Sequence, residues 1–163
     1  MFSKTADTSL KVYGDADYAG DLEGRRSTSG FVFVLSGGAV AWASKLQSTV
    51  ALSTQEAEYI AAALVTREAL WMNHILTPMR LAKAPVVIQT DNQAALKLTK
   101  DHVTSQRAKH IDVVYHFVRD RVAKLHVKFE YCPTNAMIAD RPCLTKAVTP
   151  QQLAMCKAGI GLV

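Results

Sequence analysis

Acidic side chains are the groups in this sequence whose types and spacing best suit chemistry. Three aspartates, Asp15, Asp17 and Asp21, lie within seven residues, directly after an alternating apolar segment that begins at Leu10. Carboxylates this close repel one another unless a cation or a cationic partner offsets their charge. The alternative for this segment alone is a solvated turn rich in Asp and Gly.

Three further carboxylates occupy comparable places. Asp91 follows the apolar segment 86–90, and Glu58 lies near the start of a predicted helix. Asp140 lies in an Ala-rich segment that is also predicted to be helical. If four carboxylates from four elements converge, with no clustered Cys or His, they favour a hard cation such as Mg²⁺ or Mn²⁺. Two such ions about 4 Å apart can activate water and stabilise the leaving oxygen in phosphodiester hydrolysis.

Three antiparallel strands are predicted ahead of the first helix. The segment 10–13 alternates apolar and polar residues, which is typical of a half-buried strand. The segment 31–35 is apolar and β-rich, and Ser36-Gly37-Gly38 predicts a hairpin turn into a third strand over 39–44. Because the first acidic cluster follows the first strand, we expect the site at that strand's end.

A long helix is predicted next, with Ser53 as its cap and Glu56 completing a Ser-x-x-Glu capping box. Residues two apart on a helix point about 200° apart, so Glu58 is the carboxylate left for the site. The helix should end before Pro78, because proline disfavours helical backbone in the residue ahead of it. The apolar stripe that we expect to lie on the sheet consists of Ile60, Leu64, Trp71 and Ile75.

The later part of the chain predicts two more strands and further helices. The near-continuous apolar run 86–90 is typical of a central, parallel-paired strand that is buried on both faces. A short helix over 94–99 and a longer one over 108–123 should follow. The segment 127–131 then alternates as a last strand.

Length and composition fit one soluble domain. The chain has 163 residues, 49% of them hydrophobic, and no linker divides it, so we expect a single domain over 1–163. Within it, 1–9 is expected to be a flexible leader and 147–163 a C-terminal extension. No apolar run approaches the roughly 20 residues that span a bilayer, and 1–9 lacks the features of a signal peptide. The chain has three cysteines, Cys132, Cys143 and Cys156. Because their number is odd and their spacing is not that of metal ligands, we expect a reducing compartment.

Positive charge is concentrated in the segment 97–128. This segment holds eight Lys and Arg against three Asp, which accounts for the whole net charge of +5. A basic segment beside acidic clusters suggests a polyanionic substrate. The commoner explanation of such a run is a solvated helix face.

Several short motifs, taken in order, closely resemble the ribonuclease H domain of copia-type retrotransposon polyproteins. The first two are Gly-Asp-Ala-Asp-Tyr-Ala-Gly-Asp at 14–21 and Arg-Arg-Ser-Thr-Ser-Gly at 25–30. The others lie at 47–53, 56–61, 91–95, 109–112, 115–119 and 139–140. Each motif is weak alone, but the series runs from about Leu10 to Lys146, which is nearly the whole chain.

The resemblance implies an α/β ribonuclease H-like fold. Its five-stranded mixed sheet has three antiparallel strands followed by two parallel ones, is flanked by helices, and has the first strand at its centre. The implied activity is an endonuclease that hydrolyses the RNA strand of RNA/DNA hybrids during reverse transcription. Carried over position by position, the implied catalytic acids are Asp15, Glu58, Asp91 and Asp140. These acids would bind two Mg²⁺ ions, which Mn²⁺ can replace. Asp17 matches no catalytic position.

The resemblance also implies binding residues and partners. The positions expected to contact nucleic acid, each also an ordinary surface residue type, are Arg25, Arg26, Thr54, Gln55, Asn92, Lys109 and His110. The expected partners are an RNA/DNA hybrid and the reverse transcriptase domain of the same polyprotein. We expect a monomer when the domain is isolated, located in a cytoplasmic retrotransposon particle or in the nucleus, without a membrane. The loop 133–137 contains no histidine, so no catalytic histidine is expected.

One departure from the family pattern follows the fourth acid. Copia-type sequences usually place one residue between Ala-Asp and Leu-Thr-Lys-Pro, whereas here Arg141-Pro142-Cys143 stand between Asp140 and Leu144, and Ala147 replaces the proline. A proline inside a helix costs roughly 3 kcal/mol. We therefore expect a displaced Asp140 and weak Mg²⁺-dependent activity that Mn²⁺ partly rescues.

Two other functions are weighed against the nuclease. The insertion keeps open a catalytically weak or inactive ribonuclease H-like domain that binds nucleic acid or serves as a scaffold. An integrase of the same superfamily fits less well, because its third acid is a Glu that follows two Asp. Here the order of the acids is Asp, Glu, Asp, Asp, and no zinc-binding His/Cys module precedes them.

Overall fold

A three-stranded antiparallel meander begins the sheet. The computed structural model describes residues 10–82, 84–93, 96, 109–133, 144–145 and 149–159. Strands β1 (Lys11–Asp17), β2 (Thr28–Leu35) and β3 (Gly38–Leu46) pair in sequence order. The β2–β3 turn is formed by Ser36 and Gly37, whose φ angles are 51° and 80°. Two positive φ angles give the turn a twist that matches the flanking strands, so the predicted hairpin is confirmed.

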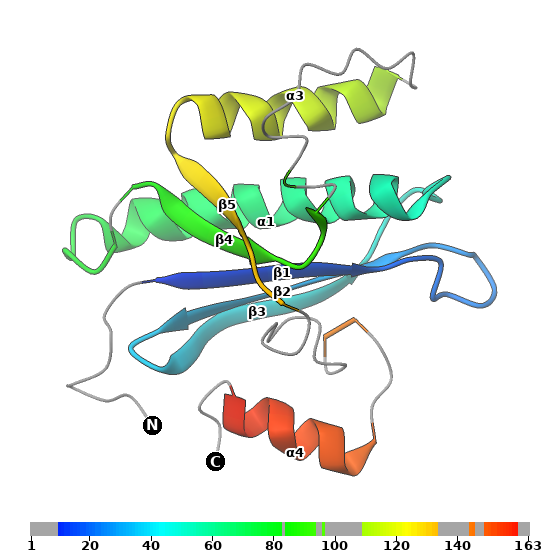
Figure 1. Cartoon of the computed structure of the whole chain (residues 1–163), viewed down its shortest axis with the longest axis horizontal. Coiled ribbons are helices and arrows are strands. Elements are labelled where there is room, and N and C mark those ends of the chain that lie inside the picture. Colours follow the sequence, from blue (N-terminus) through cyan, green and yellow to red (C-terminus); the bar gives the residue numbers. More distant parts are fainter. Residues whose placement is uncertain are drawn as a thin grey trace.

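Two parallel strands complete the sheet. Strand β4 (Val86–Thr90) pairs parallel with β1, and β5 (Val127–Tyr131) pairs parallel with β4. The strand order is β3-β2-β1-β4-β5, which places β1 at the centre (Figure 1). The mixed sheet of three antiparallel and two parallel strands is confirmed. The prediction that β4 is an inner strand paired in parallel is confirmed, but it is buried on one face and only half-buried on the other.

Helices lie on both sides of the sheet (Figure 1). Helices α1 (Thr54–Leu76) and α3 (Lys109–Ala123) lie on one side, and α4 (Pro150–Gly159) lies on the other. Helix α1 ends before Pro78 as predicted, and α3 coincides with the predicted helix 108–123. Helix α4 was not predicted, although Thr149-Pro150 is a helix-start signal, with proline in the first turn. None of the described helices is long and apolar enough to cross a membrane.

Helix α1 packs on the sheet through small side chains. Ala61, Val65 and Ala69 are almost fully buried, and Val65 and Ala69 belong to the main core. Gly14 of β1 lies opposite Val65. If Gly14 carried a side chain, its Cβ atom would lie 2.6 Å from Cγ2 of Val65, so one of the two atoms would have to move. Only glycine therefore allows α1 to lie this close to β1.

The predicted contact stripe of α1 is only partly correct. Leu64 packs against the main core, but Trp71 and Ile75 are 59% and 40% exposed, and Val65 and Ala69 face the sheet instead. The two stripes are about 100° apart around the helix axis. The buried face of α1 has small side chains only where it crosses Gly14, and its later part carries the larger core residues Met72 and Leu76.

Two predicted helices fall outside the described residues. The segment 94–99 is described only at Leu96, whose N–H donates to the carbonyl of Asn92 over 3.3 Å. The segment 134–143, with Asp140 and the Pro142-Cys143 insertion, also lies outside them. The expected displacement of Asp140 therefore stays a prediction, as do the leader over 1–9 and the extension over 147–163.

Candidate active site

Asp15 lies inside β1 rather than after it. The strand continues to Asp17, and Asp15 pairs with Gly30 of β2. On the other side, β1 pairs with β4 up to Tyr13 and Gln89. Continuing this register by two residues brings Asp15 level with Asp91, directly beyond the end of β4. Asp15 is only 4% exposed, so its carboxylate is shielded from bulk water.

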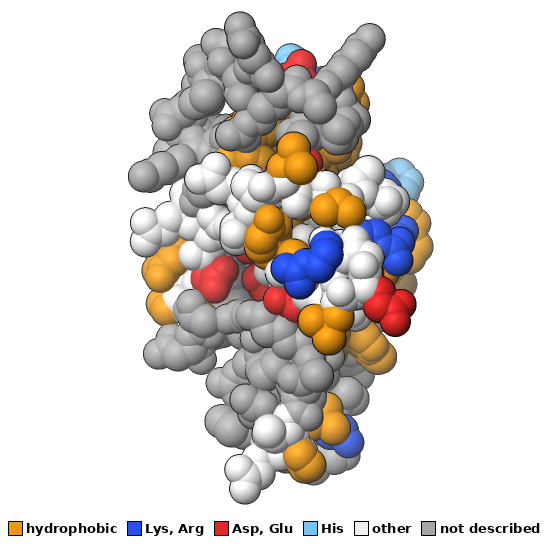
Figure 2. Space-filling model, turned by 90° about the vertical axis from the view of Figure 1, so that its right-hand side faces the viewer, with side chains coloured by type: hydrophobic (Ala, Val, Ile, Leu, Met, Phe, Trp, Pro, Cys, Tyr) orange, Lys and Arg blue, Asp and Glu red, His pale blue; other side chains and the backbone are white. Residues whose placement is uncertain are grey.

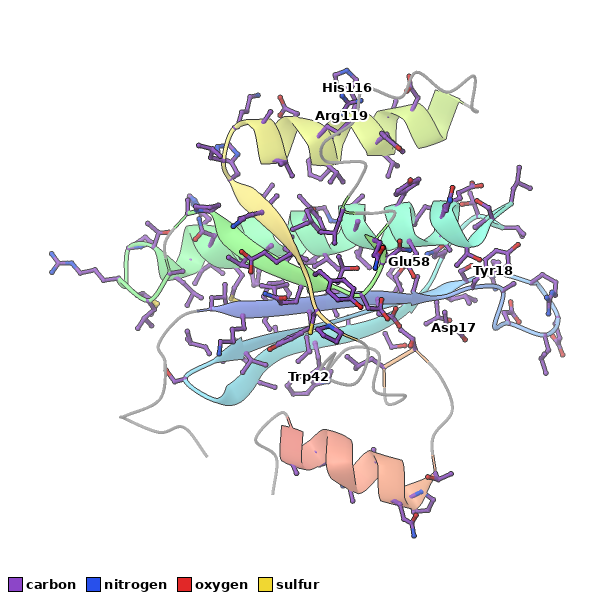
Figure 3. All side chains as sticks on the ribbon, in the orientation of Figure 1. Asp17, Tyr18, Trp42, Glu58, His116 and Arg119 are labelled. Carbon is purple, nitrogen blue, oxygen red and sulfur yellow. The ribbon has the colours of Figure 1, made fainter. Side chains whose placement is uncertain are left out.

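Glu58 lies on α1 near the same end of the sheet. It is 8% exposed, and it lines a small cavity together with Gly14 of β1 and Thr90 of β4. Figure 3 shows Glu58 on the sheet side of α1, beside the end of β4. Because Gly14 and Thr90 directly precede Asp15 and Asp91, the three predicted acids come from three elements that meet at one end of the sheet.

The capping box assigns different roles to the two neighbouring glutamates. The N–H of Glu56 donates to Oγ of Ser53 over 3.2 Å, as predicted. Oε2 of Glu56 accepts a 2.9 Å bond from the N–H of Leu52, one residue before the cap rather than at the cap itself. Glu56 is therefore engaged in holding the start of α1, which leaves Glu58 two residues further along as the carboxylate at the site.

Gln47 connects the sheet to α1 beside Glu58. Its Nε2 donates to Oγ of Ser29 on β2 and to the carbonyl of Ala57 on α1, both over 2.9 Å. Its own N–H donates to the carbonyl of Ser27 over 2.8 Å. Gln47 is 4% exposed, so these bonds lie inside the protein. Sequence analysis assigned this residue no role beyond its place in the motif at 47–53.

Asp15 has a partner that sequence analysis missed. Oγ1 of Thr145 donates to Oδ2 of Asp15 over 3.1 Å, and both side chains are buried. Leu144 packs against the back of the sheet, with Val32, Val34 and Cys132. The only sequence signal for this contact is the Leu-Thr-Lys motif, which the family resemblance places after the last acid.

Asp91 lies where the site opens to solvent. Both Asp91 and Asn92 are half-buried, and the N–H of Asn92 donates to Oγ1 of Thr90 over 3.2 Å. The N–H of Cys132 donates to the carbonyl of Thr90 over 2.9 Å, which ties the segment after β5 to the end of β4. Burial raises the pKa of the Cys132 thiol, and the negative charge of Asp91 raises it further. Asp91 thus lies near the ends of both parallel strands.

The donor chemistry of these acids fits a hard cation, since their ligand atoms are carboxylate oxygens. Within the described ranges, however, no three His, Cys, Asp or Glu side chains lie close enough together to hold a metal ion. The fourth predicted ligand, Asp140, lies outside those ranges. The described residues thus supply a partial ligand set rather than a complete metal site.

Comparisons with known proteins identify the relatives of the chain. No protein-family model matches it. It is 43% identical over 157 residues to the retrovirus-related Pol polyprotein from transposon TNT 1-94 of Nicotiana tabacum, a match that covers 96% of the chain and 12% of the polyprotein. The chain is a homologue of plant transposon Pol polyproteins. The polyprotein from transposon RE1 of Arabidopsis thaliana is 37% identical over 152 residues, covering 91% of the chain and 10% of its own length. The chain thus spans only about a tenth of these relatives.

Solved structures show the fold of this Pol homologue. The N-terminal RNase H domain of Rv2228c from Mycobacterium tuberculosis matches with a TM-score of 0.60 at 11% identity, over 92% of this chain and 96% of that one. LC11-RNase H1, solved in complex with an RNA/DNA hybrid, also gives 0.60, at 12% identity, over 83% and 93%. The foamy viral protease-reverse transcriptase gives 0.52 at 16% identity, and the match covers 77% of this chain and 17% of that one. The Pol homologue therefore has the ribonuclease H fold, and the copia-type resemblance is confirmed.

The two arginines predicted to contact nucleic acid lie in the β1–β2 loop. Asp21 organises this loop, since its Oδ1 accepts from the N–H of Glu23 over 3.3 Å and its Oδ2 lies 3.5 Å from Nε of Arg26. A backbone hydrogen bond from Gly24 and the nearby Arg26 lower the pKa of Asp21. Arg25 is exposed at a φ of 52°.

The remaining candidates surround the same end of the molecule or lie on α3. Thr54 and Gln55 are exposed in the first turn of α1, near Glu58. Lys109 and His110 begin α3, and their side chains lie outside the described structure. Asp17 lies on the side of the sheet away from α1, and its carboxylate folds over Gly20 (Figure 3). Asp15, two residues earlier in β1, shares this face, so the absence of a catalytic role for Asp17 stays a prediction.

The face that carries the acids has mixed character. Figure 2 shows acidic side chains near its centre, with a Lys or Arg side chain and several hydrophobic ones beside them. A separate groove of about 510 Å³ crosses the outer side of α1 between the end of β3 and α3. Its described lining includes Gln47, Ile60 and Phe117 but not Asp15, Glu58 or Asp91, so the largely apolar groove is distinct from the part of the site that the structure describes.

Proposed function

We propose that this Pol homologue is a ribonuclease H domain that hydrolyses the RNA strand of RNA/DNA hybrids during reverse transcription. The observation that carries the proposal is the arrival of Asp15, Glu58 and Asp91 from three elements at one end of a sheet with the ribonuclease H fold. Surface solvation does not explain two of these carboxylates, because Asp15 and Glu58 are buried.

The proposed chemistry is phosphodiester hydrolysis assisted by two divalent cations. Asp15, Glu58, Asp91 and Asp140 would hold two Mg²⁺ ions, or Mn²⁺ in their place, which would supply the activation of water and the neutralisation of charge on the leaving oxygen. The chain's own contribution is to fix its carboxylates: Glu58 through the start of α1, and Asp15 through the central strand. Asp91, half-exposed at the strand end, lies where a phosphodiester can enter from solvent.

Substrate recognition would come from the rim of the site. Contacts to the hybrid are proposed for Arg25, Arg26, Thr54, Gln55, Asn92, Lys109 and His110. The 2′-hydroxyl of RNA would distinguish the strand to be cut. The match to about a tenth of each Pol polyprotein, together with the likeness to part of a protease-reverse transcriptase, supports a domain that works beside a reverse transcriptase. We further propose that the domain is monomeric when isolated and works within a cytoplasmic particle or the nucleus.

The test is cleavage of a hybrid whose RNA strand is labelled, with Mg²⁺ present or chelated. We expect cleavage by the wild type that chelation abolishes, and loss of cleavage in D15N and D91N, since each keeps the shape of the side chain but removes a charge. The matched control is D17N, in the same strand and on the same side as Asp15, which should cut normally. Near-normal cutting by D15N or D91N would contradict the proposal.

The same assay separates the nuclease from the scaffold alternative. A wild-type domain that binds the hybrid but leaves it intact with both Mg²⁺ and Mn²⁺ would favour a non-catalytic nucleic-acid-binding domain. Equal cutting of duplex DNA would refute recognition of the RNA strand.

A further inference from the structure

We propose that Thr145 is a positioning residue of the active site, whose hydroxyl fixes the orientation of the Asp15 carboxylate for cation binding. The inference rests on the proposed function, because it concerns how one of the proposed metal ligands is held. Thr145 stands near the C-terminal end of the chain and Asp15 near its start, so 130 residues separate the two partners.

The direction of the hydrogen bond is set by chemistry. A carboxylate is only an acceptor, so the hydroxyl of Thr145 must donate its single proton to Oδ2 of Asp15, over 3.1 Å. The two side chains are 7% and 4% exposed, so water competes weakly for the bond. A hydrogen bond to a charged acceptor is stronger than one between neutral groups. This bond therefore restricts rotation of the carboxylate group about its Cβ–Cγ bond.

Thr145 packs against the sheet at Gly30, where the lack of a side chain leaves space for it. Gly30 of β2 pairs with Asp15, and a Cβ atom at Gly30 would lie 2.7 Å from Cγ2 of Thr145 and 3.1 Å from Cβ of Leu144. The absence of a side chain at Gly30 therefore makes room for the methyl group of Thr145. Leu144 is anchored on the same face by the Val32 and Val34 cluster. The methyl group of Thr145 packs against Gly30, while its hydroxyl donates to Asp15.

This division between methyl and hydroxyl allows packing to be separated from positioning. T145V keeps the methyl contact with Gly30 but replaces the hydroxyl with a second methyl group. T145S keeps the hydroxyl but deletes the methyl group. A role in packing alone predicts that T145S is the more damaging change, whereas a positioning role predicts that T145V is.

The matched control is Thr66 of α1. Thr66 is fully buried, and its Oγ1 has no hydrogen-bond partner. T66V is therefore the same substitution at a buried site where the hydroxyl makes no bond, and it lies outside the proposed catalytic and binding residues.

The experiment measures Mn²⁺ binding to the purified domain by calorimetry, and the Mg²⁺ concentration that gives half-maximal cleavage of the hybrid. Loss of a group that orients a metal ligand typically weakens metal affinity or activity by about 10- to 100-fold. We expect T145V to weaken Mn²⁺ affinity and raise the Mg²⁺ requirement by that order, whereas T145S and T66V stay close to the wild type. G30A, which displaces Thr145 without changing its hydroxyl, should resemble T145V.

The Mn²⁺ affinities of these variants decide the inference. Wild-type Mn²⁺ affinity in T145V would overturn it, as would a loss in T145S as large as that in T145V. If T145V does not fold, G30A and T145S carry the comparison, and unchanged Mn²⁺ affinity in G30A would overturn it. If the wild type binds Mn²⁺ but cuts no hybrid, the proposed function fails while the affinity comparison still decides the role of Thr145. Absence of Mn²⁺ binding by the wild type would overturn both.

Discussion

Glu56 and Glu58 lie two residues apart on α1, and their hydrogen-bond partners predict opposite mutational effects. E58Q should abolish RNA-strand cleavage, because it removes the charge at the site. E56Q keeps an oxygen that can accept from Leu52, so it should cut normally and lose less than about 1 kcal/mol of unfolding free energy. Hybrid cleavage and urea unfolding of both variants check this. A cleavage defect confined to E56Q would mean that the two roles are exchanged.

At the residue scale, local spacing predicted some roles and not others. The capping box separated Glu56 from Glu58 because a cap and its partner are three residues apart, within one helical turn. Gln47 and Thr145 bond to groups that are 10 and 130 residues away. Such contacts depend on how the elements pack, so no local pattern in the sequence predicts them.

The contact between α1 and β1 can be tested through Gly14. G14A places a methyl group 2.6 Å from Val65, and overpacking of this kind typically costs about 1–3 kcal/mol. V65A should relieve the clash, so the double variant should be more stable than the sum of the two single changes predicts. A double-mutant cycle in urea measures this coupling. If the two effects simply add, the added methyl group is accommodated by movement of the sheet rather than of Val65.

The two hydrogen bonds from Nε2 of Gln47, which we call the Gln47 clamp, give a second prediction at the scale of elements. Q47A removes the donor that joins Ser29 to Ala57 and leaves both acceptors buried, so we expect a loss of about 1–3 kcal/mol in unfolding free energy. The control is Q55A, which truncates an exposed glutamine in the first turn of α1. Urea unfolding compares the two. Equal stability of the two variants would mean that the clamp contributes little.

The elements themselves were predicted more accurately than their packing. Alternation, turn residues and caps placed β2, β4 and α1 close to their observed bounds. The face of α1 was only partly correct because apolar residues fit two neighbouring stripes at helical spacing, and contact with Gly14 selects the stripe that includes Val65. Sequence alone does not reveal which of two apolar stripes meets a glycine across the interface.

Charge is a property of the whole molecule, and it predicts how hybrid binding responds to salt. Each phosphate that the protein neutralises should steepen the fall in affinity, with a slope of about −0.9 in log affinity against log salt. R25A should therefore reduce this slope by about 1. The control is R80A, since Arg80 is also exposed in a loop with positive φ, 59°, but lies beyond the opposite end of α1. Binding titrations at several salt concentrations check this, and equal slopes for the two variants would remove Arg25 from the interface.

The topology of the whole sheet was predicted through the family resemblance rather than from the strands. Alternation patterns identify strands but not their neighbours, and the order β3-β2-β1-β4-β5 depends on two parallel pairings between distant segments. That topology brings the ends of β1 and β4 together, so Asp15, Glu58 and Asp91 come from elements that meet at one end of the sheet. Convergence of their carboxylates on one metal site stays a prediction, and Asp140 lies outside the described residues.

The separation of Thr145 from Asp15 along the chain also bears on the order of folding. The β1–β2–β3 meander closes over short separations, which costs the least chain entropy, whereas the Asp15–Thr145 bond closes over 130 residues. During synthesis all five strands leave the ribosome before Thr145 does. A nascent chain that ends at Tyr131 therefore contains every strand of the sheet but lacks Thr145, the residue proposed to orient Asp15. If Thr145 acts as proposed, competence for cleavage is among the last properties that the domain acquires as it is made.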